Sequence, residues 1–394
     1  MRHVRSWVGV CAVLVFAGGA AAQTGGAFGS ASTPLAPLTP PGGPPAAFPP
    51  ATPSTGSPVR SLASLPEDQL PVKDLTPSNV FHDLHPEEKH HGHEVPGCLA
   101  SVVPEHGGWY ANAEFLLMRP RNSDFDVVVR APSTGLGTVG PIESFKYSPG
   151  TGLRAEIGYV ADGGKWDVAF AYTYFTASDD YTSFAGANQV LLPTFTRPGL
   201  TDRVLTATGN ADLDYQLFDM LGGRRFAIEE NLAIRAIAGF RFTDIRQTLD
   251  VAFDGGDARK AAVKTRSRFQ GFGPLVGAEA TLAGPKGFHL YTRATGGFLT
   301  GNSVNAVIET NDSGATTYVN TRNDVRKVVP FGSLAIGGGW QYRSVAIRAG
   351  YEITHFQDIF ERPRFVDDVS QGKVINRASS LSLEGLFIQG SVIY

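Results

Sequence analysis

The chain has 394 residues, which is enough for one large barrel or two ordinary domains. Charged residues make up 18% of it, below the ~25% that is typical of soluble domains. The net charge of −3 is nearly neutral, so the composition gives no reason to expect a nucleic-acid partner.

Residues 1–22 have the organisation of a secretory signal peptide. Two early arginines precede an apolar run, and a stretch of small residues ending at Ala22 forms an A-x-A cleavage site. The run is too short for a membrane anchor helix. We therefore expect export and cleavage after Ala22, which would leave Cys98 as the single cysteine and allow no intramolecular disulfide.

Residues 23–106 do not have the pattern of a folded domain. Ten prolines lie between Pro34 and Pro58 among small residues, which predicts a disordered, partly polyproline-II tether in the periplasm. A later stretch, HDLHPEEKHHGHEVPGC, has side chains of the types that bind divalent metals. Its spacing matches no closed zinc module, so we expect no built metal site and no cofactor. The weak candidate ligands are His82, His85, His90, His91, His93 and Cys98.

Residues 107–394 alternate apolar and polar side chains with a period of two, which indicates β-strands. The clearest example is GYVADGGKWDVAFAYTYF at 158–175, where a D-G-G turn separates two alternating runs. We predict ten strands, at 109–119, 151–161, 165–176, 206–221, 230–249, 263–283, 287–300, 326–342, 344–358 and 379–394.

The connections between these strands alternate in length. Short turns are expected at DGGK, around GGRRFAIEEN, at GPKG and near Arg343, and long loops at 120–150, 177–205, 250–262, 301–325 and 359–378. Outer-membrane barrels have short periplasmic turns and long extracellular loops. The fold class predicted is therefore all-β, a transmembrane antiparallel up-and-down β-barrel of about ten strands. If residues 126–130 pair with 142–147 inside the first loop, the number becomes twelve.

The two faces of the strands differ in charge. In a soluble sandwich the apolar face would meet another sheet, whereas in a barrel it meets lipid. A charge that faces lipid at mid-depth costs ~2–4 kcal/mol, which explains why the central apolar runs contain none. The opposite face would line a lumen. The candidate lumen-lining residues are Glu114, Arg154, Glu156, Arg235, Arg241, Arg293, Arg348, Glu352 and Glu384.

Aromatic residues lie near the predicted strand ends, as in the girdles of membrane barrels. The final strand closes on Tyr394, and outer-membrane assembly machinery reads terminal aromatic strands of this kind. The spacing from Gly390 is one residue shorter than in the usual signal, and an edge strand that ends in tyrosine by chance is the alternative. The candidate girdle is Trp109, Tyr159, Trp166, Tyr174, Trp340, Tyr342 and Tyr394.

Several stretches resemble the Legionella-type pore-forming outer membrane proteins and the related outer-membrane β-barrel porins of planctomycetes. They are GWYANAEFLLMRPRNSDFD at 108–126, GLRAEIGYVADGGKWDVAFAYTYF at 152–175, FGPLVGAEATLAGPKGFHLYTRATGGFLTGN at 272–302 and the final strand. The resemblance covers the barrel and not the tether. It implies an outer-membrane location and pore formation, and it carries no catalytic residues.

Three functions compete. The first is a narrow porin-like channel for small hydrophilic solutes or ions, lined by the charged residues above. The second is a non-conducting barrel that anchors extracellular loops and the tether, because side chains fill barrels of about eight strands and Phe175 and Phe218 are predicted to point inward. The third is an enzyme, but neither His289 nor His355 has a Ser or Asp at a spacing that predicts a triad. We therefore expect no catalytic activity.

Overall fold

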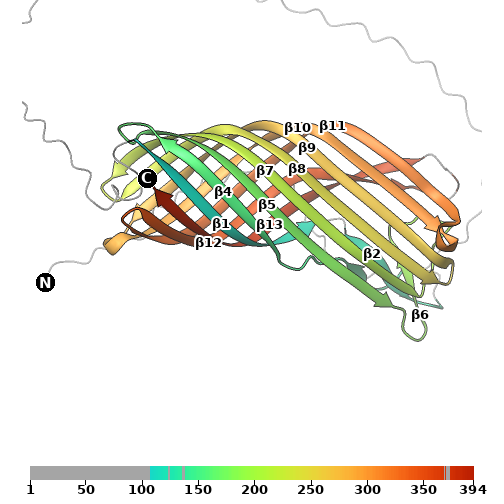
Figure 1. Ribbon diagram of the computed structural model, residues 1–394. Helices are drawn as coiled ribbons and strands as arrows, with labels where there is room; N and C mark the ends of the chain where they lie inside the picture. The colour runs from blue at the N-terminus through green and yellow to red at the C-terminus, as the bar shows by residue number, and fades with distance from the viewer. Residues whose placement is uncertain (1–106, 123–124, 135–137, 368, 370–372) are drawn as a thin grey trace, which may run out of the picture. The chain divides into compact units, whose positions relative to one another are not determined.

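The structure is a computed structural model that describes residues 107–122, 125–134, 138–367, 369 and 373–394. In it, ten antiparallel strands close into a barrel, as predicted (Figure 1). The predicted signal peptide, the tether and the candidate metal ligands lie outside the described residues. Within the described part of the chain, no helix has the length and apolarity needed to cross a membrane.

Each strand pairs with its neighbours in the ring, and β1 closes the ring between β13 and β4. The turns at residues 161–165, 230–231, 284–287 and 343–344 lie at one end of the barrel, called here the turn end, together with the end of the last strand (Figure 1). The opposite end is called the cap end. The ring strands are β1 (Gly108–Asn122), β4 (Gly150–Val160), β5 (Trp166–Phe184), β7 (Thr206–Glu229), β8 (Leu232–Gly255), β9 (Ala258–Ala283), β10 (Phe288–Asn311), β11 (Thr316–Tyr342), β12 (Val345–Phe365) and β13 (Val374–Ile393), and two short 3-10 turns lie at η1 (Pro285–Gly287) and η2 (Asp312–Gly314).

The DGGK turn between β4 and β5 shows how the sequence sets one hairpin. Gly163 and Gly164 have φ angles of 84° and 68°, which glycine adopts at little cost. The amide of Ala161 donates to the carbonyl of Trp166 at 2.9 Å and closes the turn. The predicted hairpin is therefore confirmed.

Several strands are longer than predicted. Residues 250–262 are not a long loop, because β8 and β9 continue to a turn at residues 256–257. Residues 301–325 likewise belong to β10 and β11, apart from the short turn around η2. The segment GGRRFAIEEN lies mostly within β7, and the turn itself is at residues 230–231.

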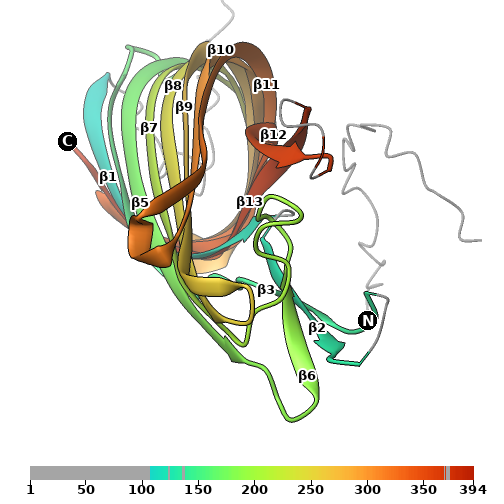
Figure 2. The same cartoon turned by 90° about the vertical axis from the view of Figure 1, so that its right-hand side faces the viewer.

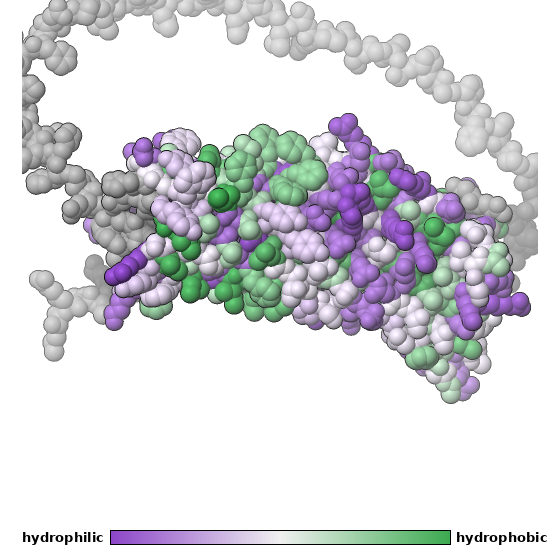
Figure 3. Space-filling model, viewed as in Figure 1, coloured by the Kyte–Doolittle hydropathy of each residue, from purple (hydrophilic) through white to green (hydrophobic). Residues whose placement is uncertain are grey.

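The strands look shorter in the sequence because their apolar parity changes side. In β8, Phe240 and Phe242 are exposed on the outer face, whereas Ile245 and Leu249 are buried inside the barrel. The alternation is interrupted between these two groups, so a single apolar face cannot be followed along the strand to its end at Gly255. Toward the cap end the outer face becomes polar, and Figure 3 shows this change from an apolar to a hydrophilic surface.

A small second sheet lies at the cap end (Figure 2). It consists of β2 (Asp126–Pro132), β3 (Ile142–Ser144) and β6 (Gln189–Pro193) in the order β3-β2-β6. The hairpin considered for the first loop therefore exists, but it does not enter the ring, and the twelve-stranded alternative is wrong. Phe145 and Tyr147 from this region join the same hydrophobic core as the buried side chains of the barrel.

Candidate functional site in the barrel lumen

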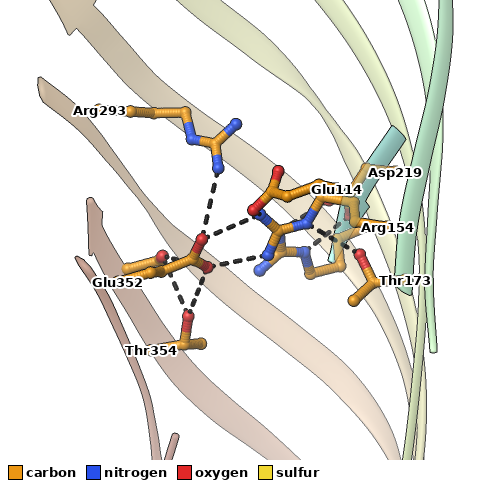
Figure 4. A network of polar contacts seen from close by, with 9 residues as sticks. Glu114, Arg154, Thr173, Asp219, Arg293, Glu352 and Thr354 are labelled. Atoms are coloured by element: carbon orange, nitrogen blue, oxygen red, sulfur yellow. Dashed lines mark hydrogen bonds and ion pairs between the residues drawn. The ribbon is translucent and has the colours of Figure 1, made fainter. Parts of the chain in front are cut away.

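Arg154 of β4 is the centre of a polar network inside the barrel. Its Nη1 and Nη2 donate to the two carboxylate oxygens of Glu352 on β12, each at 2.9 Å. Its Nη1 also donates to Glu114 of β1 at 2.8 Å, so that the guanidinium lies between two carboxylates (Figure 4). The exposed fractions of the three side chains are only 14%, 3% and 4% for Arg154, Glu352 and Glu114.

The surrounding residues complete this network. Glu352 also accepts from Ser333 at 3.3 Å and from Thr354 at 3.2 Å, and it lies 3.5 Å from Arg293. Arg154 Nε donates to Thr173 at 3.1 Å. Two acids and two arginines balance one another, and buried charges are stable only when paired and hydrogen-bonded. The network is therefore neutral as a whole, and its side chains are held in place by hydrogen bonds.

Further ion pairs line the interior. Arg241 makes two hydrogen bonds of 2.7 Å to Asp219, and its guanidinium lies 4.7 Å from the centre of the Phe331 ring. Arg348 pairs with Glu279 at 3.2 Å. Near the turn end Arg235 and Arg225 share Asp167, and Glu156 accepts from Asn112 at 3.0 Å. Each arginine predicted to line the lumen therefore has an acidic partner.

The acids Asp167, Asp219 and Glu279 were not among the predicted lumen residues. Asp167 lies on the same parity of β5 as Thr173, so the alternation alone could have identified it. Asp219 could not be assigned because the apolar side chains of β7 change from the inner face, at Leu217, to the outer face, at Phe218. Glu279 lies in a glycine-rich strand whose faces could not be assigned from the sequence.

Aromatic rings meet across the lumen on the cap side of the network. The rings of Tyr215 on β7 and Phe356 on β12 contact each other with centroids 5.9 Å apart. In the ring order four strands separate β7 from β12 on either side, so this contact spans the barrel. Phe175 packs on Tyr215 at 6.4 Å, and Phe331 stacks on Phe356 at 5.9 Å. Water reaches almost none of the surface of these rings.

Polar side chains also meet inside the barrel on the cap side of these rings. Asn122 of β1 donates to Gln247 of β8 at 3.3 Å across the interior. The cavity beside this bond, which is also lined by Phe125, Phe360 and Arg362, has a volume of about 20 Å³. That is room for about one water molecule.

Two residues predicted to point inward lie on the outer face instead. Phe218 is 49% exposed, whereas Phe175 is buried as expected. Glu384 lies on the exposed parity of β13, because Leu383 beside it is buried, and it forms an ion pair with Arg121, whose side chain is 65% exposed. An outward charge is tolerated there because the apolar run of β13 has already ended.

The predicted girdle residues are all exposed on the outer face. Trp340 and Tyr342 stack at 5.9 Å near the turn end, and Trp109 meets Tyr159 at 5.3 Å. Tyr174 differs from the prediction, because β5 continues to Phe184 and leaves this tyrosine in the middle of the strand.

Glu309 is a buried acid in the polar-surfaced, cap-end part of β10, beyond the apolar outer face. It is 1% exposed, and its Oε2 accepts from the backbone amide of Arg197 at 2.8 Å. Its Oε1 has no hydrogen-bond partner among the described residues. Burial raises the pKa of Glu309 to about 7, although the hydrogen bond and charge of Arg197 oppose the shift.

We expect the segment around Arg197 to loosen as the pH rises. The unfolded chain loses the proton near 4.5 and the folded chain near 7, so this contact becomes less stable between those values. The measurement is hydrogen exchange of residues 194–203 at pH 5.5 and pH 8, corrected for intrinsic rates. Glu309→Gln should abolish the pH effect on protection, and an unchanged effect in this variant would contradict the assignment.

The outer surface near the turn end has the dimensions of a membrane-spanning band. On β9 the outward side chains from Leu282 to Phe272 are all apolar, over ten residue steps. At ~3.4 Å per residue and a tilt of ~45° this run is about 24 Å high, close to the ~25 Å of outer-membrane barrels. A closed sheet with this outer band and a charged interior defines an outer-membrane β-barrel protein.

The family is shown by the sequence. Residues 102–394 match the family described as the Legionella pneumophila major outer membrane protein precursor, and the chain belongs to this family. The comparison with curated proteins gave no match.

Similar solved structures are also outer-membrane barrels or channels. The outer membrane protease OmpT of Escherichia coli has 11% identity and a TM-score of 0.44, over 73% of this chain and 97% of that one. The Pseudomonas putida toluene transporter TodX has 8% identity and a TM-score of 0.23, over 75% and 92%. A Pseudomonas aeruginosa FadL homologue has 8% identity and a TM-score of 0.20, over 73% and 90%. We transfer no activity from them.

Proposed function

We propose that this protein is a closed outer-membrane barrel that acts as a structural anchor. The turn end would face the periplasm, where the tether would lie, and the cap end would face the outside. The observation that supports a closed lumen is the contact between Tyr215 and Phe356 from opposite walls. We further propose that the assembly machinery inserts the barrel through its C-terminal strand β13.

Opening a path would require breaking buried contacts. Separating Arg154 from Glu352 would break two buried hydrogen bonds and leave Arg154 with Glu114 and Glu352 with Arg293 as their remaining ionic partners, at a cost of about 3–5 kcal/mol. At 1.4 kcal/mol per tenfold, an open form would be present in roughly one molecule in a hundred to one in several thousand. The rings above would also have to move. An anchor is therefore favoured over a permanently open pore.

A narrow porin-like channel is the second candidate. The observation in its favour is the charged interior between the turn end and the rings, where Arg348, Glu279 and Glu156 lie. The resemblance to pore-forming proteins points the same way. In this alternative the network of Arg154 would be the constriction that selects ions or solutes.

Planar-bilayer recording of the refolded, signal-free chain distinguishes the two candidates. We expect no discrete conductance steps from the wild type, and steps from Tyr215→Ala/Phe356→Ala, which removes the rings that close the lumen. Phe240→Ala/Phe272→Ala is the matched control, because these two rings stack on the outer face. Heat-shifted gel mobility would establish that each sample is folded.

Steps from the folded wild type would refute the anchor and support the channel. Their reversal potential in a salt gradient would then report whether arginines or glutamates dominate the path. No conductance from the wild type, together with conductance steps from Tyr215→Ala/Phe356→Ala, would show that the rings are the barrier.

We also propose that the barrel has no hydrolytic activity. His355 Nδ1 and Ser382 Oγ are 2.8 Å apart, but both lie on the outer face. Among the described residues no carboxylate contacts His355 to orient its ring. A serine–histidine contact without that third group lacks the arrangement of a catalytic triad.

A further inference from the structure

The outer face of the barrel carries a cluster of basic side chains on β9 and β11 toward the cap end. Strand pairing places Arg266 opposite Ala306 of β10, and Ala306 opposite Arg322 of β11. Two arginines therefore flank one small side chain across three adjacent strands. The cluster, called here the basic patch, consists of Lys264, Arg266, Arg268, Arg322 and Arg326.

The charges of the basic patch are mostly unpaired. Arg268 makes hydrogen bonds of 3.0 and 2.7 Å to Asp244. The other four have no hydrogen bond or ion pair among the described residues, although Asp324 lies between the two arginines of β11. The arginines predicted to line the lumen, by contrast, all have acidic partners. Unpaired cations held at fixed strand positions produce a local positive potential that attracts anions.

The basic patch begins where the membrane-spanning band ends. The last apolar outward residues are Phe272 on β9 and Val328 on β11. Arg268 lies four residues before Phe272, and Arg326 lies two residues before Val328. Figure 3 shows the hydrophilic surface directly beside the apolar one. Long basic side chains at such a boundary extend toward the headgroup layer of the lipid.

The floor of the basic patch is apolar. Around Arg266 and Arg322 the outward side chains of β10 are Val304, Ala306 and Ile308, and Asn302 lies farther along, opposite Arg326. The three apolar side chains offer no competing hydrogen-bond group, and an apolar floor strengthens the attraction between the arginines and a bound anion. Three outward acids adjoin the patch: Asp244 bonds Arg268, Asp250 of β8 lies opposite Lys264, and Asp324 lies on β11. The five basic side chains outnumber these three acids, so the patch keeps a net positive charge.

We propose that the basic patch binds the phosphate group of an outer-leaflet lipid headgroup, held between Arg266 and Arg322 over Ala306. A lipid is the proposed ligand because the patch adjoins the lipid-contacting band, where headgroup phosphates are concentrated and free phosphate is not. The proposal rests on the proposed orientation, with the cap end outside, and holds whether or not the lumen conducts.

Native mass spectrometry of the full refolded chain in detergent, titrated with short-chain phosphatidic acid, tests the site. Arg266→Gln/Arg322→Gln should weaken binding about thirty-fold, which corresponds to about 2 kcal/mol at 1.4 kcal/mol per tenfold and about 1 kcal/mol per basic residue. Lys165→Gln/Arg343→Gln removes the same charge from exposed positions at the turn end and should leave binding unchanged. Ala306→Leu should weaken binding without any change of charge, because it fills the floor.

Equal weakening by the turn-end control would overturn the proposal, because only net charge would then matter. Competition by inorganic phosphate at the same concentration as the lipid would also overturn it, since the ligand would then be the free anion. Unchanged binding in both patch variants, with folding verified by heat-shifted mobility, would place the lipid elsewhere.

Discussion

Glu352→Ala is expected to lower the free energy of unfolding by about 3–5 kcal/mol. The substitution leaves Arg154 and Arg293 sharing the single carboxylate of Glu114 in a buried site, and a buried charge without its partner is strongly destabilising. The measurement is urea unfolding of the refolded protein in lipid vesicles, followed by tryptophan fluorescence and heat-shifted gel mobility.

Glu384→Ala is the matched control for this variant. Both glutamates were predicted to line the lumen, but the structure places Glu384 on the outer face beside exposed Arg121. An exposed ion pair contributes about 0–1 kcal/mol, so this variant should remain close to the wild type. Glu352→Ala/Arg293→Ala restores a neutral site and should recover part of the loss. Equal effects of Glu352→Ala and Glu384→Ala would contradict the interior network.

Phe356→Ala should lower the free energy of unfolding by about 3–5 kcal/mol through a different mechanism. The ring is fully buried against Tyr215 and Phe331, and its removal leaves a cavity in the middle of the barrel. The same unfolding experiment measures the loss.

Phe298→Ala is the control on the outer face, where the ring is 59% exposed. Lipid chains refill the space that it leaves, so only a partial transfer loss of about 1–2 kcal/mol is expected. A Phe356→Ala variant no less stable than Phe298→Ala would mean that the rings do not pack across the lumen.

Many of the residues that line the lumen could be predicted from the alternation of polar and apolar positions along the strands. Arg154, Arg241 and Glu352 share the polar parity of their strands, and the structure places them inside the barrel. Their pairing could not be predicted, because the contact between β4 and β12 depends on the ring order and on the stagger of the strands. Residues 198 positions apart, such as Arg154 and Glu352, decide whether these charges face water or one another.

The position of Glu384 shows where the alternation of apolar and polar residues does not predict which face a side chain occupies. A charged side chain can lie on the outer face once its strand has left the apolar band, and no local signal marks that depth. The same transition reverses the apolar parity within β8, and the sequence predicts loops at 250–262 and 301–325, where β8 to β11 continue toward the cap end.

Local chemistry specifies the ten strands, their tight turns and the apolar outer band, because the period of two and the glycines of a turn act over a few residues. The packing of the barrel interior has another origin. It depends on the meeting of Tyr215 with Phe356 and of Arg154 with Glu352, from strands that touch only after the ring closes. The entropic cost of bringing such distant segments together is recovered through their packing, and that packing is a property of the whole barrel.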